Sequence, residues 1–270
     1  MENQKILYRG IMAFDGTNFH GFQVQPDKRT VQGEMEQALA SILGTKTIVY
    51  GAGRTDAGVH ALAMPFSFTS HLNIPPQGLI AILNKTLPHD ITVLRLGYAP
   101  EGFHPRFSTH KKTYRYMVSF SNPNPFLRHH CSFYNYRSAD IDTYIKALSY
   151  FKGTHDFTSF TKNKEAIDYV RTIDDITFKV EDKLVTCDIT SSGFLHNEVR
   201  IIVAMALETS RGQYSIEDLK HIESLKNRQY APKIAPGCGL YLLNVHYDDN
   251  FGEVDLEGEA VYNVADSHLI

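Results

Sequence analysis

The segment that begins at Thr30 carries apolar residues at helical spacing. Val31 and Met35 start an apolar stripe that recurs every three or four positions as far as Leu43. Thr30 stands directly before the stripe and is a favourable N-cap residue. A helix with one apolar face must bury that face against another element, so the chain needs a sheet or further helices to cover it.

Further helices and strands are indicated along the rest of the chain. Similar stripes follow Asp140, span 195–208 and begin at Ser215. Strands are expected at 5–14, 91–96, 112–120, 173–180, 184–190 and 240–247, which are rich in β-branched and aromatic residues. Segments 5–14 and 111–120 share Lys, Tyr, Arg and Phe in register, which hints at two related halves. We predict an α+β fold, with helices on one face of a shared, mainly antiparallel sheet.

The division expected from chain order has three parts. Residues 1–108 form an N-terminal α/β half, 109–247 form a C-terminal α/β half, and 248–270 form an acidic tail. Seven acids and no lysine or arginine fall between 246 and 270, so the net charge of −3 for the whole chain corresponds to +4 for residues 1–245. A mildly basic body is compatible with a nucleic-acid partner.

Composition excludes several classes of protein. Hydrophobic residues make up 43% and charged residues 21%, as in ordinary globular chains. No apolar run is long enough to span a membrane and the first residues lack the layout of a signal peptide, so we expect a cytoplasmic protein without a membrane partner. Cys131, Cys187 and Cys238 have no metal-ligand spacing, and neither zinc nor a disulfide framework is expected.

The most unusual stretch is 51–60, GAGRTDAGVH, in which small residues surround Arg54 and Asp56. Glycine lets the backbone adopt positive φ and lets a bulky ligand approach closely. A dinucleotide fingerprint would require a small residue at Asp56, and a phosphate loop would require Lys-Ser/Thr where Val59 and His60 stand. From the motif alone, a functional loop and a tight turn with a solvated Arg-Asp pair both remain open.

The motif and other segments, taken in order, resemble the TruA family of tRNA pseudouridine synthases. The matching segments are 15–26 (DGTNFHGFQVQP), 30–32 (TVQ), 103–108 (FHPRFS), 112–116 (KTYRY), 153–157 (GTHDF), 171–173 (RTI), 193–200 (GFLHNEVR) and 239–242 (GLYL). The resemblance implies two similar α/β halves with a catalytic cleft between them. It also implies conversion of uridine to pseudouridine in the anticodon stem-loop of tRNA, without a cofactor or metal, by a homodimer.

The resemblance assigns roles to five residues. Asp56 would be the catalytic carboxylate, and Arg200 the arginine that pairs with it. Arg54 would occupy the space left by the flipped uridine, while Tyr114 would lie against the uracil and Leu240 would close the far side of the base pocket. Without the resemblance, Tyr114 and Leu240 read as core residues and Arg200 as a snorkelling helix residue.

Some positions depart from the family pattern. Phe22 stands where the family commonly has tryptophan, and Asn197, Glu198, Ile201 and Ala204 differ from its usual arginine helix. Glu198 is expected to add negative charge near Arg200. The alternatives are therefore a paralogue acting on another RNA, or a catalytically idle RNA-binding protein. A glycosidase would use paired carboxylates, and Asp56 has no evident partner in the sequence.

Overall fold

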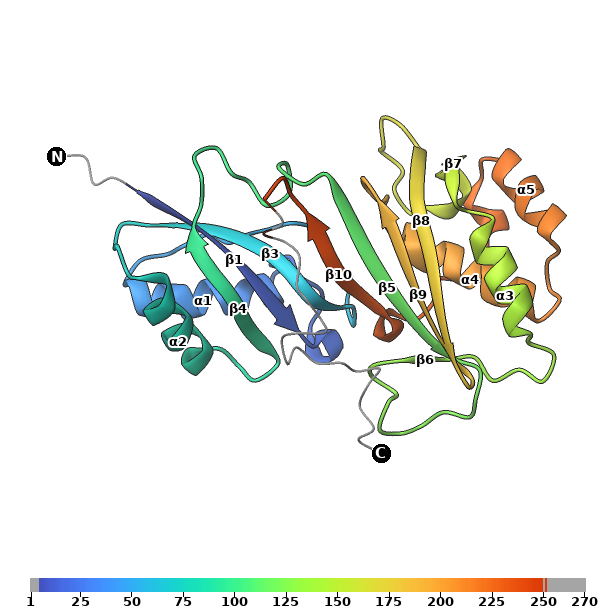
Figure 1. Cartoon of the computed structure of the whole chain (residues 1–270), viewed down its shortest axis with the longest axis horizontal. Coiled ribbons are helices and arrows are strands. Elements are labelled where there is room, and N and C mark those ends of the chain that lie inside the picture. The colour runs from blue at the N-terminus through green and yellow to red at the C-terminus, as the bar shows by residue number, and fades with distance from the viewer. Residues whose placement is uncertain (1–4, 250, 252–270) are drawn as a thin grey trace. The chain divides into compact units, whose positions relative to one another are not determined.

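The computed structural model describes residues 5–249 and residue 251, so most of the predicted acidic tail lies outside the described residues. The chain divides into two compact units, which we call unit 1 (1–110 with 242–270) and unit 2 (111–241) (Figure 1). This division groups residues 242–246 of the last strand with unit 1, whereas the sequence-based domain limits, which stay a prediction, follow chain order.

Unit 1 is built on an antiparallel sheet. Strand β1 (Ile6–Phe14) pairs on one side with β3 (His60–Ser70) and on the other with β4 (Ile91–Tyr98). The short β2 (Tyr50–Gly51) pairs with β3, and β10 (Leu240–His246) follows β3 in the strand order. Apart from Thr69, every residue of β3 is buried, so both faces of this strand are covered.

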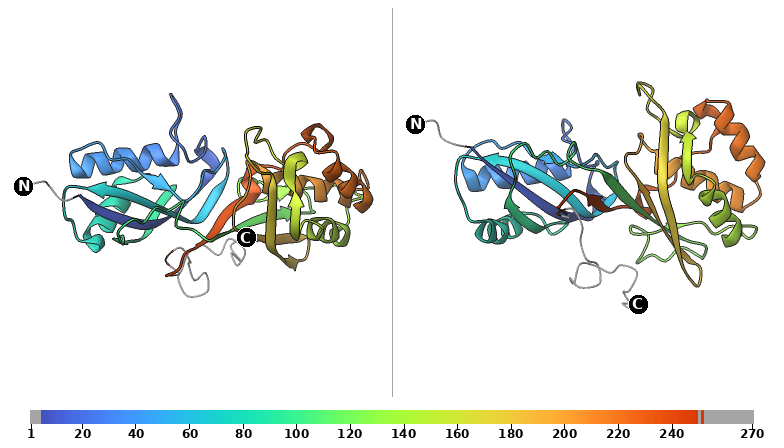
Figure 2. Two further views of the ribbon diagram at one scale, coloured as in Figure 1. Left: turned by 90° about the horizontal axis from the view of Figure 1, so that it is seen from above. Right: turned by 45° about the horizontal axis from the view of Figure 1, so that its top comes forward.

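Two α-helices pack in the described part of unit 1. Helix α1 (Val31–Leu43) begins where predicted, because the Thr30 hydroxyl accepts a hydrogen bond from the Gly33 amide at 3.2 Å. It ends at Gly44, which adopts the left-handed conformation with φ of 69°. Helix α2 (Pro76–Thr86) contacts α1 and packs against β4. Figure 2 shows α1 running beside the strands of this unit.

Unit 2 has a second antiparallel ladder. Its strands lie in the order β5 (Lys111–Ser119), β9 (Leu184–Ser191), β8 (Val170–Glu181) and β7 (Gly153–Asp156). The two-residue β6 (Ser132–Phe133) pairs with β5 in parallel. The predicted strands at 173–180 and 184–190 lie inside β8 and β9, and the strand predicted at 112–120 corresponds to β5.

Three helices lie on the same side of the β8–β9 ladder in Figures 1 and 2: α3 (Ile141–Ser149), α4 (Glu198–Ser210) and α5 (Ile216–Ser224). Asp140 caps α3 through a 2.7 Å bond from the Thr143 amide, and Ser215 caps α5 in a capping box with Asp218. Helix α4 starts at Glu198, three residues later than predicted, because the chain turns through Asn197 with φ of 61°.

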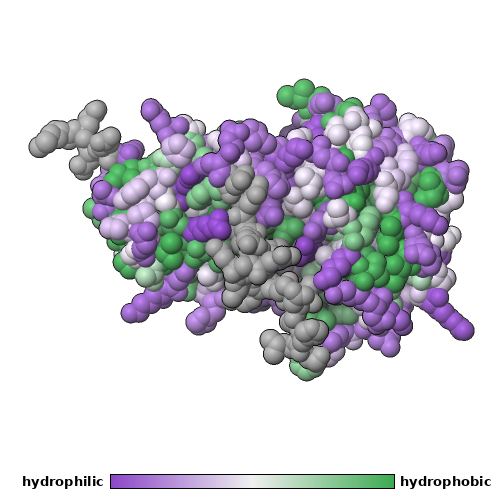
Figure 3. Space-filling model, viewed as in Figure 1, coloured by the Kyte–Doolittle hydropathy of each residue, from purple (hydrophilic) through white to green (hydrophobic). Residues whose placement is uncertain are grey.

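The mixed α/β architecture with a mainly antiparallel sheet is confirmed. Within the described part of the chain, no helix is long and apolar enough to cross a membrane. Hydrophilic residues spread over the described surface of each unit on the face shown in Figure 3, with smaller hydrophobic patches between them.

Candidate active site

The loop at 51–60 connects β2 to β3 in unit 1 and presents its two charged residues differently. Arg54 is exposed, Asp56 is half-buried, and Thr55 between them is buried. The loop backbone is held by a 2.9 Å bond from the Ala52 amide to the Pro65 carbonyl. A second bond joins the Val59 amide to the Asp56 carbonyl at 3.2 Å, which closes a tight turn directly after the carboxylate residue.

The segment that precedes α1 fixes the position of this loop. The Phe22 amide donates to the Thr55 carbonyl at 3.1 Å, and the Gly58 amide donates to the Phe19 carbonyl at 3.4 Å. Gly21 has φ of 95°, and a β-carbon there would lie 2.6 Å from the Thr55 carbonyl oxygen. The motifs at 15–26 and 51–60, which are separate in sequence, therefore form one structure in unit 1.

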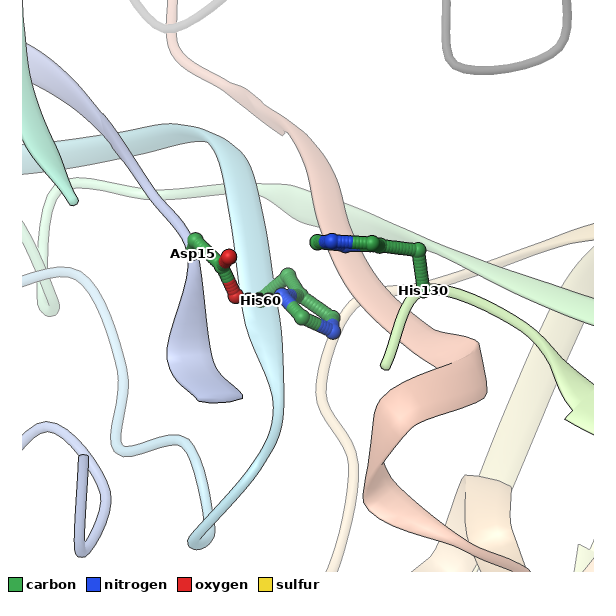
Figure 4. A group of neighbouring side chains, drawn as sticks. All are labelled: Asp15, His60 and His130. Atoms are coloured by element: carbon green, nitrogen blue, oxygen red, sulfur yellow. Dashed lines mark ion pairs between the residues drawn. The ribbon is translucent and has the colours of Figure 1, made fainter. Parts of the chain in front are cut away.

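Asp15 and His60 reinforce the far end of the loop (Figure 4). Nδ1 of His60 lies 3.0 Å from the Gly16 amide nitrogen and 3.1 Å from Oδ1 of Asp15. Unprotonated, it accepts a hydrogen bond from the amide; protonated, it donates one to the carboxylate, so it makes only one of these bonds at a time. Burial alone would raise the pKa of Asp15, but hydrogen bonds from His60 and Thr17 outweigh it and lower that pKa. Asp15 is thus held as a carboxylate that organises the turn.

Arg29 ties the same segment to the start of β4. Its guanidinium donates to both carboxylate oxygens of Asp90 at 2.7 and 2.8 Å, and its Nε donates to Glu34 at 2.8 Å. The guanidinium carbon also lies 4.2 Å from the centre of the Phe19 ring. Bidentate pairing fixes geometry as well as charge, so Arg29 helps hold the segment that supports the loop. Sequence reasoning missed this residue, because nothing in the spacing links Arg29 to a partner 61 positions away.

Phe22 is the buried aromatic side chain of this scaffold. It is 3% exposed, and a β-carbon at Gly51 would lie 2.4 Å from its ring. Gly51 is therefore required by the ring that packs against the first residue of the loop. The role of Phe22, which departs from the tryptophan common in the family, is structural support of the loop in this chain.

The other predicted site residues lie in unit 2 or at its edge. Tyr114 is a half-buried residue of β5, and its ring meets Phe194 edge to face with centroids 5.3 Å apart. Arg200 is a half-buried residue of α4 whose Nε donates to the Ala235 carbonyl at 2.8 Å, while the Ala235 amide donates back to the Arg200 carbonyl at 3.1 Å. Leu240 is buried at the start of β10.

Each predicted residue therefore sits on a defined element. Arg54 and Asp56 share one loop of unit 1, while Tyr114, Arg200 and Leu240 come from three elements, β5, α4 and β10. The Arg200 guanidinium is anchored to the backbone through its bond to the Ala235 carbonyl.

Glu198 corrects one expectation drawn from the sequence. The side chain is fully buried, and only Oε2 has a hydrogen bond, from the Leu195 amide at 2.7 Å; Oε1 is buried without a partner among the described residues. Burial raises the pKa of Glu198 to about 8, although the Leu195 amide and the charge of Arg171 lower it in part. The carboxyl is therefore mostly protonated at neutral pH, and the predicted negative charge near Arg200 is wrong.

The three cysteine thiols lie in environments that favour their protonated form. Cys131 and Cys187 are buried, and burial raises the pKa of each thiol to about 12. Cys238 is half-buried, and its pKa is raised for the same reason. Neutral thiols are weak nucleophiles.

Comparison with known proteins identifies the family. The family model described as tRNA pseudouridine synthase matches residues 11–108 and 147–248. A tRNA pseudouridine synthase A from Anoxybacillus flavithermus is 45% identical over 88% of this chain and 97% of its own length. Proteins of the same name from a Geobacillus species and from Bacillus subtilis are each 43% identical over 88% of this chain and cover 97% and 98% of their own lengths. The chain belongs to the tRNA pseudouridine synthase family, whose members are isomerases that convert uridine to pseudouridine.

Proposed function

We propose that this chain isomerises uridines in the anticodon stem-loop of tRNA, with Asp56 as the catalytic carboxylate. The observation that carries the proposal is the placement of Asp56, a half-buried acid beside the exposed Arg54 in a loop locked by the Phe22–Thr55 bond. A carboxylate of this kind can reach a substrate without leaving a rigid support, which reactions of bound substrates require.

The reaction fits a single carboxylate. The bond between N1 of uracil and C1′ of ribose breaks, the base turns, and a bond between C5 and C1′ forms; the C5 proton leaves and N1 gains a proton. The product is an isomer, so the balance needs no oxidant, reductant or nucleotide. Asp56 would either add to C1′ or remove a proton from the ribose, and both routes need it ionised.

The remaining residues would bind the uridine once it has left its stack. The planar guanidinium of Arg54 would fill the vacated space, because it can stack on bases as well as carry charge. Tyr114 would lie against the uracil, and Leu240 would cover it from the other side. Arg200, anchored through Ala235, would pair with the Asp56 carboxylate.

The test is the substitution Asp56→Asn, assayed with unmodified tRNA transcripts and carbodiimide mapping of pseudouridine. We expect product formation to disappear while tRNA binding is nearly unchanged, because the shape remains and the charge is lost. Asp27→Asn is the matched control, since Asp27 is exposed and its φ of 56° suits asparagine. Turnover by the Asp56 variant would remove Asp56 from the mechanism.

The same assay distinguishes the alternatives. Product restricted to anticodon stem-loop uridines supports the proposed target, and product at another RNA position indicates a paralogue with a different target. Wild-type protein that binds tRNA but yields no product on any transcript would be the idle RNA-binding protein.

We also propose a homodimer, as in the family this chain resembles. Sedimentation at working dilution should give twice the chain mass. A fully active monomer would contradict the proposal.

A further inference from the structure

The segment 103–108 matches the family but has no role in the function proposed above. It folds as a compact turn in unit 1. The His104 carbonyl accepts bonds from the Phe107 and Ser108 amides at 3.2 and 3.0 Å, and the Ser108 hydroxyl accepts from the His104 amide at 3.1 Å. These bonds hold the turn in one conformation.

The turn presents aromatic rings on the surface. The His104 ring lies 4.5 Å from Phe107 and 5.4 Å from Tyr50, measured between centroids. Phe107 is 76% exposed and Tyr50 is 49% exposed, so the outer faces of both rings meet solvent. We call Tyr50, His104 and Phe107 the ring platform.

His104 contributes a neutral ring to the platform. Its Nδ1 accepts a hydrogen bond from the Arg106 amide at 3.1 Å, which requires that nitrogen to be unprotonated. Burial, and secondly the charge of Arg106, lower the pKa of His104 below its ordinary value. The exposed Arg106 guanidinium lies 5.7 Å from the Phe107 centroid, so a positive charge borders the rings.

The turn is anchored from below. The Tyr247 hydroxyl donates to the Pro105 carbonyl at 2.6 Å, and Phe103 packs on Tyr247 with centroids 5.5 Å apart. An aromatic side chain left in solvent contributes little to stability, because burial is what makes it stabilising. A rigid, anchored turn that keeps Phe107 in solvent is therefore better explained by a ligand than by packing.

The platform also adjoins the proposed catalytic loop. Tyr50 belongs to β2 and directly precedes Gly51, the first residue of the loop that carries Asp56. A nucleic acid held at this loop would pass close to the platform within unit 1.

We propose that the ring platform stacks an unpaired base of the tRNA other than the isomerised uridine, and that Arg106 binds a neighbouring phosphate. This proposal rests on the proposed function, since it takes tRNA as the substrate. Exposed aromatic rings beside a positive charge are the elements that bind single-stranded nucleic acid.

The test measures binding of unmodified tRNA transcript to full-length Asp56→Asn protein that also carries Phe107→Leu. Leucine keeps an apolar side chain but loses the aromatic face, so we expect about tenfold weaker binding. Phe107→Trp should restore it. Phe126→Leu is the matched control, because Phe126 is 74% exposed in unit 2 and should leave affinity unchanged. Thermal unfolding of each variant checks that the fold is intact.

Salt dependence separates the two parts of the platform. Loss of a stacked base should weaken binding equally at all salt concentrations, whereas Arg106→Gln should reduce the slope of log affinity against log salt by about 0.7–0.9. Unchanged affinity of Phe107→Leu, or failure of tryptophan to restore binding, would overturn the proposal. The proposal would also be overturned if Phe107→Leu changed the sedimenting mass relative to wild type in the absence of RNA, because the rings would then form a protein contact.

The outcome is independent of the proposed chemistry. If wild-type protein forms pseudouridine and Phe107→Leu binds as tightly as wild type, only the platform proposal fails. If wild-type protein forms no product yet Phe107→Leu binds tRNA more weakly, the platform stands and the catalytic proposal fails.

Discussion

The amide of Phe22 donates to the carbonyl of Thr55 at 3.1 Å, one residue before the proposed catalytic Asp56. Gly21 makes this contact possible, because its φ of 95° turns the chain toward the loop and it has no β-carbon to strike the Thr55 carbonyl. The position of the carboxylate is therefore determined by a residue that is remote in sequence and has no chemical role.

Gly21→Ala should impair catalysis through this contact. A β-carbon would lie 2.6 Å from a backbone oxygen, so the loop must shift, and a displacement of about 1 Å can lower turnover about 100-fold. The measurement is the single-turnover rate of pseudouridine formation with saturating tRNA.

Gly78→Ala is the matched control for this substitution. Gly78 lies in α2, and a β-carbon there would meet no atom within 4 Å. Alanine in a helix is favoured over glycine by roughly 0.5–1 kcal/mol, so this variant should be active and slightly more stable. Wild-type turnover by Gly21→Ala would show that the loop does not depend on the contact.

Much of the fold could be predicted from capping residues and apolar spacing, because these features depend on only a few neighbouring residues. Helices begin after Thr30, Asp140 and Ser215 as expected, and each of these side chains accepts a capping hydrogen bond. Strand β3 was not predicted, because Pro65 interrupts it and its first half is rich in alanine and leucine rather than β-branched residues. Helix α2 was missed as well, since it is short and its start at Pro75 and Pro76 resembles a loop.

The candidate site was predictable only where chemistry is concentrated in a short motif. Arg54 and Asp56 stand two positions apart, and their loop is visible in the sequence. The pairing of Arg29 with Asp90 depends on tertiary contact, and so does the burial that neutralises Glu198. Spacing carries no information on either, because both depend on which distant segments pack together.

Glu198 should make stability depend on pH in an unusual direction. Its pKa rises from 4.5 to about 8 on folding, so the native state binds more protons than the unfolded state between these values. The stability gained by keeping the buried Glu198 carboxyl neutral is fully present below pH 4.5 and is lost as pH rises through about 8. Urea unfolding of wild type and Glu198→Gln at pH 5.5 and 9 measures this.

The glutamine variant cannot ionise at this position. Its free energy of unfolding should therefore rise relative to that of wild type as pH rises, by on the order of a few kcal/mol by pH 9. At pH 5.5 this gain should be present but smaller, because the native carboxyl is still neutral and only the unfolded state is ionised. A constant difference between the two proteins at both pH values would show that Glu198 ionises equally in the folded and unfolded states.

Arg29→Lys should lower stability although the charge is kept. Lysine cannot donate to both oxygens of Asp90 and to Glu34 in the fixed geometry of a guanidinium, and it loses the planar contact with Phe19. Arg29 is partly exposed, so we expect a loss on the order of 1 kcal/mol in urea unfolding. Arg137→Lys, at an exposed position, is the control and should be silent. Equal stability of both variants would mean that the bidentate geometry contributes nothing.

Arg54→Lys distinguishes two roles for the exposed arginine of the loop. If Arg54 is only a solvated partner of Asp56, lysine should be nearly silent, because exposed pairs contribute about 0–1 kcal/mol. If it fills the space left by the flipped uridine, lysine should fail, because an ammonium has no planar face to stack on bases. We expect the second result on intact tRNA.

The loss should be much smaller on a transcript whose target uridine is mispaired, since a base that is already unpaired costs less to extrude. The measurement is the ratio of variant to wild-type turnover on the two transcripts. Equal losses on both would assign Arg54 to the chemical step or to phosphate binding, and its stacking role would have to be abandoned.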